Sequence, residues 1–573
     1  MHTALSAVHT RDGLTVKGYR GDRSALLAFD LAESLTAGLA GFAIRVKPPK
    51  GAAYWLPNRL SFATAYTSKT TAKDRVWTDS VAAPFQKFHW VHFPASVPPG
   101  VFTYEVTAMY HGASGLKKGP TVATQLDLQA DGFANLEYGF TRGYMSSQAY
   151  ATRFKNADVR PGKTLDFDIK PYEERWAWLG GHGREIIKTF VADCLAAAQS
   201  SANVSVDVFA YDLDAPDLLA DLAKLKNKLR VFIDDSDGHT KAGALEPVAG
   251  RRLADAGAAV RYGHFRRYAH QKVMILRRNG VPVAAISGSA NFSVRGLYVQ
   301  ANNVLRWNDA TVAGWFGQAF DLAFASGVEK PGDKFSGTEP FKKSALAKAW
   351  LDVPPLDLPT AKLSFAPHTD GKISLDLVSQ ELAAADSSVL FAVMELGGSG
   401  ATLKRLREVA ADPGIYSYGI TQKTSGDISL YKPGSNRGVL VPFAALSQQV
   451  PANFRKETAG GQGQVIHHKF IVVDFNDTNP VVFAGSSNLA ELAEQENNDN
   501  LFALYDRNVA TAYAIEALRL VDHNHFRAAL TQATAAKPLR LQGPKPDGKA
   551  APWWQRYYDR DDLRCRERTL FVR

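Results

Sequence analysis

The sequence predicts an α/β protein: an all-β, sandwich-like N-terminal domain followed by two similar α/β halves with mixed sheets flanked by helices. Three observations support this fold class. Runs rich in aromatic and β-branched residues dominate the first 170 residues, helices and short buried strands alternate after about residue 183, and one block of motifs occurs twice. With 573 residues, 45% hydrophobic and 22% charged, the chain has an ordinary globular composition and room for several domains.

The N-terminal domain is predicted to cover residues 1–170. Residues 88–93 and 101–107 are strand-like and flank the turn Pro98-Pro99-Gly100, as in a β-hairpin. Helical periodicity is scarce here, which favours a β-sandwich. This stretch contains no group of residues typical of a catalytic site.

Alternating helices and strands then define the rest of the chain. Residues 204–209 and 229–233 are apolar strands that follow helical segments, and residues 389–394 repeat that pattern after a segment rich in Lys, Gly and Pro. The predicted units are the first half at 175–330, a linker at 331–360, the second half at 361–531, and a basic aromatic tail at 532–573.

Two blocks of polar motifs lie in identical register. The first contains His270, Lys272, Gly288, Ser289, Asn291 and Asn303, and the second contains His467, Lys469, Gly485, Ser486, Asn488 and Asn500. Every counterpart lies 197 positions later, as from 270 to 467. In each block the His and Lys share one face at the start of an apolar strand, and a second strand leads to the GSxN turn. We expect the copies to face each other around a phosphodiester, where one imidazole attacks phosphorus and the other protonates the leaving oxygen.

These motifs resemble the signature of the phospholipase D superfamily, which is HxK, an Asp five residues after the Lys, and GSxN downstream. The second copy matches it fully, with Asp474 at the Asp position, whereas the first copy has Arg277 there. The resemblance covers about residues 175–530. It implies two similar α/β halves with the active site at their interface. It also implies phosphodiester hydrolysis or transfer through a phosphohistidine, with no metal and no cofactor.

The resemblance also implies a role for each motif residue. His270 maps to the nucleophile and His467 to the general acid, while the carboxylate that orients a motif histidine maps to Asp499 and is replaced by Asn302 in the first copy. Because Arg277 and Asn302 make the first copy electrostatically unusual, either the histidine roles are swapped or activity is reduced. The expected catalytic residues are His270, His467, Lys272, Lys469, Asp474 and Asp499, and the expected substrate-binding residues are Ser289, Asn291, Ser486, Asn488, Asn303 and Asn500.

The substrate class stays open between alternatives. The formal charge of +10 is compatible with an anionic substrate but is not diagnostic of nucleic acid. A phospholipid head group is favoured, and a nuclease acting on DNA or RNA is the alternative that the pI of 9.2 and the basic tail support. A third reading, a non-catalytic phosphate-binding protein, is motivated by Arg277 and Asn302. Since both half-sites lie in one chain, we expect a monomer.

The chain shows no run of 18 apolar residues and no signal-peptide pattern, so a cytoplasmic protein without a membrane span is expected. Export by a route that reads no cleavable signal stays open. The tail, with Trp553, Trp554, Tyr557 and Tyr558, could contact phosphates or a membrane surface, but packing against the chain is favoured. Cys194 and Cys565 on their own cannot make a disulfide framework or a four-ligand zinc site.

Four further features have a structural and a functional interpretation. His468 should face away from the site and be structural. The acidic turn from Asp234 to His239 lacks the spaced oxygen ligands of a calcium loop, so no metal site is predicted. Gly397 to Gly400 is interpreted as a plain strand-to-helix turn. Residues 422–464 form either a substrate-shaping rim or a surface insertion of no consequence, the rim candidates being Tyr431, Lys432, Arg437, Phe454, Arg455 and Lys456.

Overall fold

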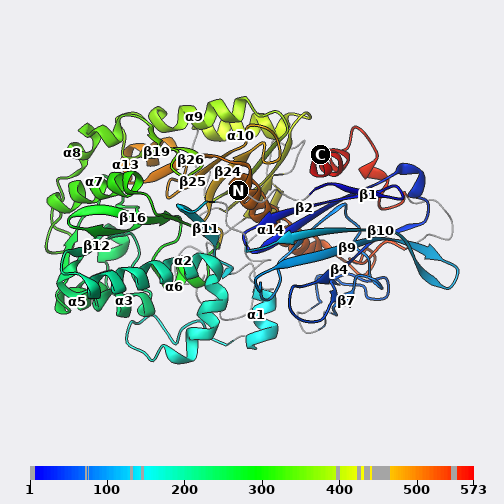
Figure 1. Ribbon diagram of the computed structural model, residues 1–573, viewed down its shortest axis with the longest axis horizontal. Coiled ribbons are helices and arrows are strands. Elements are labelled where there is room, and N and C mark those ends of the chain that lie inside the picture. Colours follow the sequence, from blue (N-terminus) through cyan, green and yellow to red (C-terminus); the bar gives the residue numbers. More distant parts are fainter. Residues whose placement is uncertain are drawn as a thin grey trace.

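A computed structural model of the chain describes residues 7–70, 74, 76–129, 133–143, 147–155, 157–394, 400–422, 428–431, 439–441, 465–543 and 551–573. Figure 1 shows the two α/β halves on one side of the molecule and the N-terminal β domain on the other. The C-terminal helix lies against the β domain, far along the sequence from the strands that it covers.

The N-terminal domain consists of antiparallel strands, as the sequence predicts. One sheet has the order β1-β2-β3-β8 and another β10-β9-β4-β5, with β6 and β7 as a separate pair. The inner faces of the two larger sheets share one apolar core. The strands are β1 (His9–Arg11), β2 (Leu14–Gly21), β3 (Ser24–Leu31), β4 (Leu39–Lys47), β5 (Tyr54–Trp55), β6 (Pro57–Asn58), β7 (Thr78–Asp79), β8 (His89–His92), β9 (Val101–Gly112) and β10 (Gly115–Asp127).

The hairpin expected around Pro98-Pro99-Gly100 is wrong. Strand β8 pairs with β3, whereas β9 pairs with β10 and β4 in the other sheet. The proline-rich connection therefore carries the chain from one sheet of the sandwich to the other. Two strands adjacent in sequence can meet either way, because sequence alone does not say which edge each strand reaches.

The first α/β half is built on a mixed sheet of order β11-β17-β16-β15-β12-β13-β14. Strand β11 precedes residue 170 and still belongs to this sheet, pairing with β17. The strands are β11 (Leu136–Phe140), β12 (Val204–Ala210), β13 (Leu229–Ile233), β14 (Ala259–Tyr262), β15 (Lys272–Arg278), β16 (Val281–Gly288) and β17 (Asn303–Trp307). The helices are α1 (Ser147–Phe154), α2 (Glu173–Ser200), α3 (Pro216–Ala223), α4 (Asp237–Thr240), α5 (Glu246–Asp255), α6 (Val294–Tyr298) and α7 (Ala310–Ser326).

The second half repeats this arrangement. Its sheet has the order β18-β19-β26-β25-β24-β20-β21-β22-β23, so that β26-β25-β24-β20-β21 corresponds to β17-β16-β15-β12-β13. The segment between the halves is structured, with α8 (Thr338–Lys343) and β18 (Leu351–Val353). The other strands are β19 (Thr360–Phe365), β20 (Ser388–Val393), β21 (Tyr416–Gln422), β22 (Ile428–Tyr431), β23 (Val439–Val441), β24 (Lys469–Val473), β25 (Val481–Gly485) and β26 (Asn500–Tyr505). The helices are α9 (Lys372–Ala383), α10 (Ala401–Ala411), α13 (Glu491–Glu496) and α14 (Arg507–Gln532).

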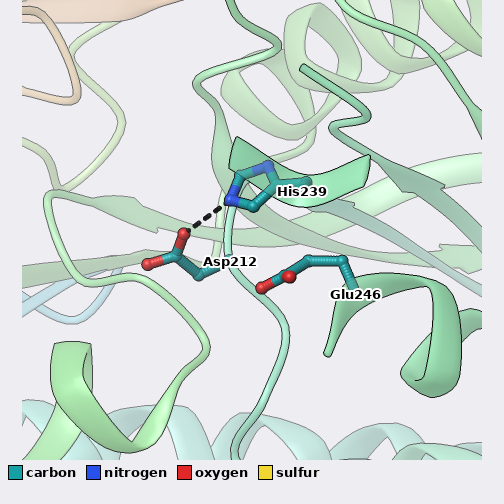
Figure 2. Close-up of side chains that lie close together, drawn as sticks. All are labelled: Asp212, His239 and Glu246. Atoms are coloured by element: carbon teal, nitrogen blue, oxygen red, sulfur yellow. Dashed lines mark hydrogen bonds and ion pairs between the residues drawn. The ribbon is translucent and has the colours of Figure 1, made fainter. Parts of the chain in front are cut away.

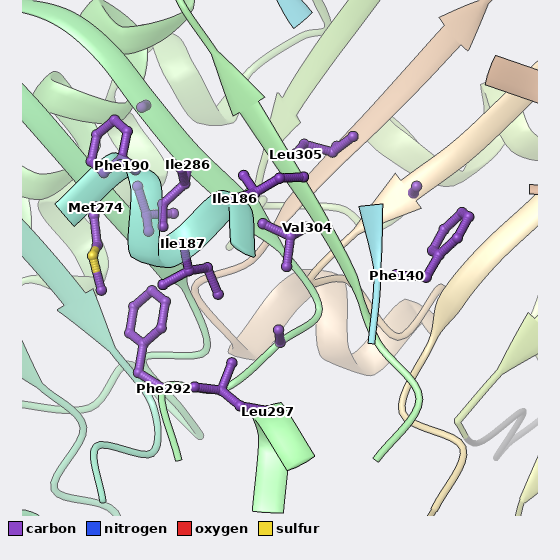
Figure 3. Close-up of a cluster of buried hydrophobic side chains, with 14 of the residues drawn as sticks. Phe140, Ile186, Ile187, Phe190, Met274, Ile286, Phe292, Leu297, Val304 and Leu305 are labelled. Atoms are coloured by element: carbon purple, nitrogen blue, oxygen red, sulfur yellow. The ribbon is translucent and has the colours of Figure 1, made fainter. Parts of the chain in front are cut away.

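Buried apolar side chains hold helix and sheet together in each half. In the first half Ile186, Ile187 and Phe190 of α2 pack against Met274 of β15 and Ile286 of β16 (Figure 3). These residues are 2% exposed or less, and burying such a side chain contributes about 1.5–3 kcal/mol. This packing fixes the ends of β15 and β16, where the motif residues lie.

The C-terminal tail packs against the β domain, which was the favoured interpretation. Tyr557 belongs to the core of the sandwich, Trp553 Nε1 donates to the carbonyl oxygen of Leu39 at 2.9 Å, and the Tyr558 hydroxyl donates to that of Leu31 at 2.6 Å. The tail ends in α15 (Leu563–Val572). Its aromatic side chains are therefore engaged inside the chain.

Among the helices in the described ranges, none combines the length and the apolar composition that crossing a membrane requires.

Candidate active site

The two halves meet at the starts of the strands that carry the HxK motifs. The backbone N–H of His270 donates to the carbonyl oxygen of Asn498, and that of His467 donates to the carbonyl oxygen of Ala301. These two contacts are related by the same shift of 197 positions as the motifs. The ring of Trp307 also stacks on that of Phe502 across the interface, with centroids 4.6 Å apart. The halves are thus paired by a pseudo-twofold relation that passes through the site.

Each motif histidine is held by a side chain from the opposite half. Nδ1 of His270 lies 2.7 Å from Oδ1 of Asp499, and Nδ1 of His467 lies 2.8 Å from Oδ1 of Asn302. Because Nδ1–H donates in both cases, the Nε2 lone pair of each neutral imidazole faces the space between the halves. The contacts therefore cross between the halves. Asp499 of the second copy holds His270 of the first copy, and Asn302 of the first copy holds His467 of the second copy.

Close backbone approach at the GSxN turns explains their glycines. Gly288 and Gly485 have φ of 138° and 159°, in the region that favours glycine. A Cβ at either position would lie 2.4 Å from the carbonyl oxygen of Asn303 or Asn500. Any other residue would push the turn away from the strand that follows it.

The serines of both turns point into the protein. The hydroxyl of Ser289 donates to Oδ1 of Asn302 at 2.8 Å, and that of Ser486 donates to Oδ1 of Asp499 at 2.7 Å. Both serines are fully buried. Each serine therefore positions the group that holds a histidine, in place of the substrate contact that the sequence analysis expected.

The two motif lysines lie in the same buried space. Nζ of Lys469 donates to the carbonyl oxygen of His467 at 3.0 Å, Nζ of Lys272 donates to that of His270, and Nζ of Lys272 also lies 4.8 Å from the centre of the Tyr211 ring. Neither ammonium forms an ion pair with any residue in the described ranges. Burial lowers the pKa of Lys272 to about 7, and burial together with the Lys272 ammonium lowers that of Lys469 well below its usual range. A bound anion would favour the charged forms of these two buried amines, so the pair is a candidate site for an anion.

The electrostatics of the two histidines differ. Burial and the Lys272 ammonium lower the pKa of His270 to about 4, although the Asp499 carboxylate opposes that shift. Burial and the ammonium groups of Lys469 and Lys272 lower the pKa of His467 well below its ordinary value, and none of the described carboxylates contacts its ring. Both imidazoles are therefore neutral without an anion, and only His270 has a partner that stabilises positive charge on its ring.

Comparison with known proteins identifies the family of the two halves. The family model "Cardiolipin synthase, PLD-like domain" matches residues 191–323 and 378–520. Both halves of the chain belong to the phospholipase D superfamily.

Solved structures similar to the chain include three at low identity. Phosphatidylserine synthase from Haemophilus influenzae is 12% identical, over 58% of this chain and 84% of that chain, with a TM-score of 0.40. The phospholipase D family member Nuc from Salmonella typhimurium is 26% identical, over 24% and 87%, with a TM-score of 0.20. Polyphosphate kinase from Porphyromonas gingivalis is 11% identical, over 54% and 44%, with a TM-score of 0.32. No curated protein sequence matches the chain.

Asp474 of the phospholipase D motif lies away from the histidines. It follows the end of β24 opposite to Lys469, a separation of roughly 16 Å at about 3.3 Å per residue. Its carboxylate accepts hydrogen bonds from the backbone N–H groups of residues 386, 387 and 388 at 2.8–2.9 Å. Asp474 thus closes the turn before β20, so the structure gives it a structural place in contrast to the catalytic one expected.

Arg277, the first-copy counterpart of Asp474, is equally remote. Its guanidinium pairs with Asp207 at 2.6 Å and with Asp321 at 3.0 Å, at the far end of β15. It therefore leaves the electrostatics of the phospholipase D-like site unchanged. Of the two first-copy departures, Asn302 alone acts at the histidines.

The four motif asparagines have different surroundings. Asn291 donates through Nδ2 to Oδ2 of Asp212 at 2.6 Å, whereas Oδ1 of Asn488 has no hydrogen-bond partner among the described residues. Asn500 donates to Oε1 of Gln271 at 2.5 Å. Asn303 is fully buried, and within the described part of the chain its side-chain amide has no partner. Asn291 and Asn488 remain candidates for substrate contact, while Asn303 and Asn500 lie inside the interface.

His468 is structural in its contacts, as expected from strand alternation. Its Nε2 lies 2.9 Å from Oε1 of Glu516 in α14, on the face of the strand opposite to His467. That glutamate also pairs with Arg519. His468 therefore offers a matched control for substitutions at His467.

Sequence reasoning missed the residues that follow β12. Tyr211 lies with its ring centre 4.9 Å from that of His270, and Tyr268 lies 5.5 Å from Tyr211. Asp212 bonds to Asn291 and to His239. The sequence offered one signal, which is that Tyr211 and Asp212 directly follow an apolar strand-like run. The structure adds that this strand ends beside the start of β15, because Ala210 pairs with Lys272 in an antiparallel register.

Two sequence interpretations fall largely outside the described residues. These are the turn at Gly397 to Gly400, of which only Gly400 is described, and the rim candidates within 422–464, namely Tyr431, Lys432, Arg437, Phe454, Arg455 and Lys456, for whose side chains no structure is described.

Proposed function

We propose that the protein is a phosphodiesterase that hydrolyses or transfers a phosphodiester through a phosphohistidine, with a phospholipid head group as the substrate. The observation that carries this proposal is the pair of oriented imidazoles beside two buried lysines that form no ion pair with the described residues. A phosphodiester anion supplies the charge that this site lacks. Lys272 and Lys469, together with Asn291 and Asn488, hold its non-bridging oxygens.

The asymmetry between Asp499 and Asn302 assigns the two histidines. In the bond-breaking step the ring of the nucleophile gains positive charge, while the ring of the general acid loses it. A carboxylate beside the first ring speeds this step, and beside the second it would slow proton donation. His270, held by Asp499, is therefore the nucleophile, and His467, held by Asn302, is the general acid.

The reaction proceeds in two balanced steps. Binding of the phosphodiester anion favours the imidazolium form of His467, which then carries a proton on Nε2 as well as on Nδ1. Nε2 of His270 attacks phosphorus, the bond from phosphorus to the leaving oxygen breaks, and that oxygen takes the proton from Nε2 of His467. Water or another alcohol then attacks the phosphohistidine, gives its proton to His467, and releases His270. Both histidines belong to one chain, so a monomer contains the complete site.

A lipid substrate is favoured over nucleic acid by two considerations. The matching family model is described by a cardiolipin synthase, an enzyme named for a phospholipid. The basic aromatic tail that favoured a nuclease has its aromatic rings packed on the β domain. The retained histidines and lysines argue against a non-catalytic descendant.

Turnover on two substrates in parallel tests the proposal. Mixed phospholipid liposomes and plasmid DNA are incubated with the protein in EDTA, with His467→Ala and His468→Ala as a matched pair. We expect cleavage of phospholipid, loss of activity in His467→Ala, and retained activity in His468→Ala. Cleavage of DNA alone would replace the lipid proposal with the nuclease, and cleavage of neither substrate would overturn the enzyme proposal in favour of phosphate binding.

The histidine roles are tested with bis(p-nitrophenyl) phosphate, whose leaving group needs no protonation. His467→Ala should still release a burst of about one equivalent of p-nitrophenol and then retain a phosphohistidine, since no group activates water. His270→Ala should give no burst. The reverse result would exchange the two roles.

A further inference from the structure

Three side chains from separate elements converge beside the active site. Asp212 follows β12, His239 lies in α4, and Glu246 is the first residue of α5. Their nitrogen and oxygen ligand atoms all lie within 4.8 Å of one another. Figure 2 shows the Glu246 carboxylate directed toward Asp212 and the His239 ring. The set therefore combines one imidazole with two carboxylates around a common point.

The histidine of this cluster is held in one orientation. Nδ1 of His239 lies 2.7 Å from Oδ1 of Asp234, while Nε2 lies 3.0 Å from Oδ1 of Asp212. In metal-binding histidines, the ring N–H that points away from the metal commonly donates a hydrogen bond to a carboxylate. This contact fixes the tautomer and raises the basicity of the nitrogen that binds the metal. Asp234 supplies that contact, and Nε2 faces Asp212 and Glu246.

Glu246 provides a second and separate indication of a ligand. It is 8% exposed, and within the described ranges its carboxylate accepts a hydrogen bond from its own backbone N–H but has no hydrogen bond or ion pair with another residue. A buried carboxylate with so little compensation is costly, and buried acidic groups are normally paired or bound to metal. The group that would satisfy Glu246 is a cation at the point toward which its carboxylate is directed.

We propose that Asp212, His239 and Glu246 bind a divalent transition-metal ion such as Zn²⁺ or Mn²⁺. Imidazole with carboxylates is a ligand set for such ions, and three protein ligands leave positions for water. For an ion about 2.1 Å from both Nε2 of His239 and Oδ1 of Asp212, the angle between these two ligands at the ion would be roughly 90°. Ligand atoms about 2.1 Å from a tetrahedral ion lie roughly 3.4 Å apart, so the Glu246 carboxylate would move toward the other two ligands by up to about 1.4 Å. The side chain of Asp212 is 25% exposed, which gives the ion a path from solvent.

The metal site borders the phosphodiester site without sharing its histidines. The Tyr211 ring lies between them, with its centre 4.6 Å from that of His239 and 4.9 Å from that of His270. The other oxygen of Asp212 accepts the hydrogen bond from Asn291. The ion would therefore fix Asp212, and through it Asn291, while the two histidines carry the chemistry. The acidic turn from Asp234 to His239 alone does not indicate this metal site, because two of the three ligands, Asp212 and Glu246, come from outside that turn.

Metal binding is measured without reference to turnover, so its outcome is separate from that of the proposed function. The protein is stripped with EDTA and titrated by calorimetry with ZnCl₂ and MnCl₂, with MgCl₂ and CaCl₂ for comparison. Co²⁺ is then added, because its visible absorption reports coordination by nitrogen and oxygen. The variants are Glu246→Gln, which removes one ligand charge, and Asp235→Asn, which changes a buried neighbouring carboxylate paired with His264 at 2.7 Å.

The wild type should bind about one equivalent of Zn²⁺ or Mn²⁺, and Glu246→Gln should weaken that binding by about tenfold or more. Asp235→Asn should bind as the wild type does. Asp212→Asn serves as a second ligand variant if the circular dichroism of Glu246→Gln shows altered folding. Absence of binding at millimolar metal, unchanged affinity in both ligand variants, or an equal loss in Asp235→Asn would overturn the site.

Discussion

Replacing Asp499 with asparagine makes the surroundings of the two histidines chemically alike. Asp499 is fully buried and accepts hydrogen bonds from Nδ1 of His270 at 2.7 Å and from Ser486 at 2.7 Å. Asparagine has the same shape and keeps an oxygen for these donors, but it lacks the negative charge. The change therefore isolates the electrostatic contribution of Asp499 to the charge that develops on His270.

The size of the effect follows from the contact. A hydrogen bond to a charged group contributes about 1.5–3 kcal/mol, and two unit charges about 4 Å apart interact by about 4 kcal/mol at an effective dielectric constant near 20. A loss of about 2–4 kcal/mol in the transition state slows phosphohistidine formation by about 30- to 900-fold. We expect that decrease in the burst rate of p-nitrophenol from bis(p-nitrophenyl) phosphate, measured by stopped-flow absorbance.

The mirror substitution, Asn302→Asp, is the matched control. It places a carboxylate at His467 and should leave the p-nitrophenol burst unchanged, because this leaving group needs no proton from His467. It should slow cleavage of a phospholipid, whose alkoxide leaving group requires protonation. A normal burst in Asp499→Asn, together with a faster burst in Asn302→Asp, would refute the assignment of His270 as nucleophile.

Three further predictions concern residues outside the catalytic group. Asp474→Asn should lower the free energy of unfolding, measured in urea, by about 2–3 kcal/mol, because several N–H donors lose a charged acceptor. Turnover per folded molecule should be retained, and a selective loss of turnover would return Asp474 to the catalytic group. His468→Gln should lower stability by about 1–3 kcal/mol and leave phosphodiester turnover intact, and an inactive but folded variant would contradict the structural role. Burial opposes protonation of His89, but the carboxylates of Glu567 and Asp522 raise its pKa to about 9. This pKa lies above that of histidine in the unfolded chain, so protonated His89 stabilises the fold. That contribution, on the order of 3 kcal/mol, is complete below about pH 6.5 and is lost as pH rises to about 9. Thermal melts of wild type and His89→Gln across this range should converge toward pH 9, and a constant difference would exclude His89 as the source.

The grouping of the motif residues could be predicted from the sequence because it depends on residue types at fixed spacing. His270 and Lys272, and their counterparts 197 positions later, fall on one face of a strand by alternation alone. The apolar pattern around them predicted two α/β halves, and the structure contains two similar sheets in those halves. The structural role of His468 followed from the same alternation.

Only the tertiary structure decided which groups touch the histidines. Asp499 lies 229 residues from its partner His270, and no local pattern states that the halves exchange these contacts. The same holds for the cluster of Asp212, His239 and Glu246, whose members lie on three elements. The family signature placed Asp474 with the catalytic residues, but an extended strand carries it to the other end of the sheet. Periodicity along a chain fixes the direction of each side chain, whereas the partner it meets depends on how distant strands and loops pack, which is a property of the folded chain as a whole.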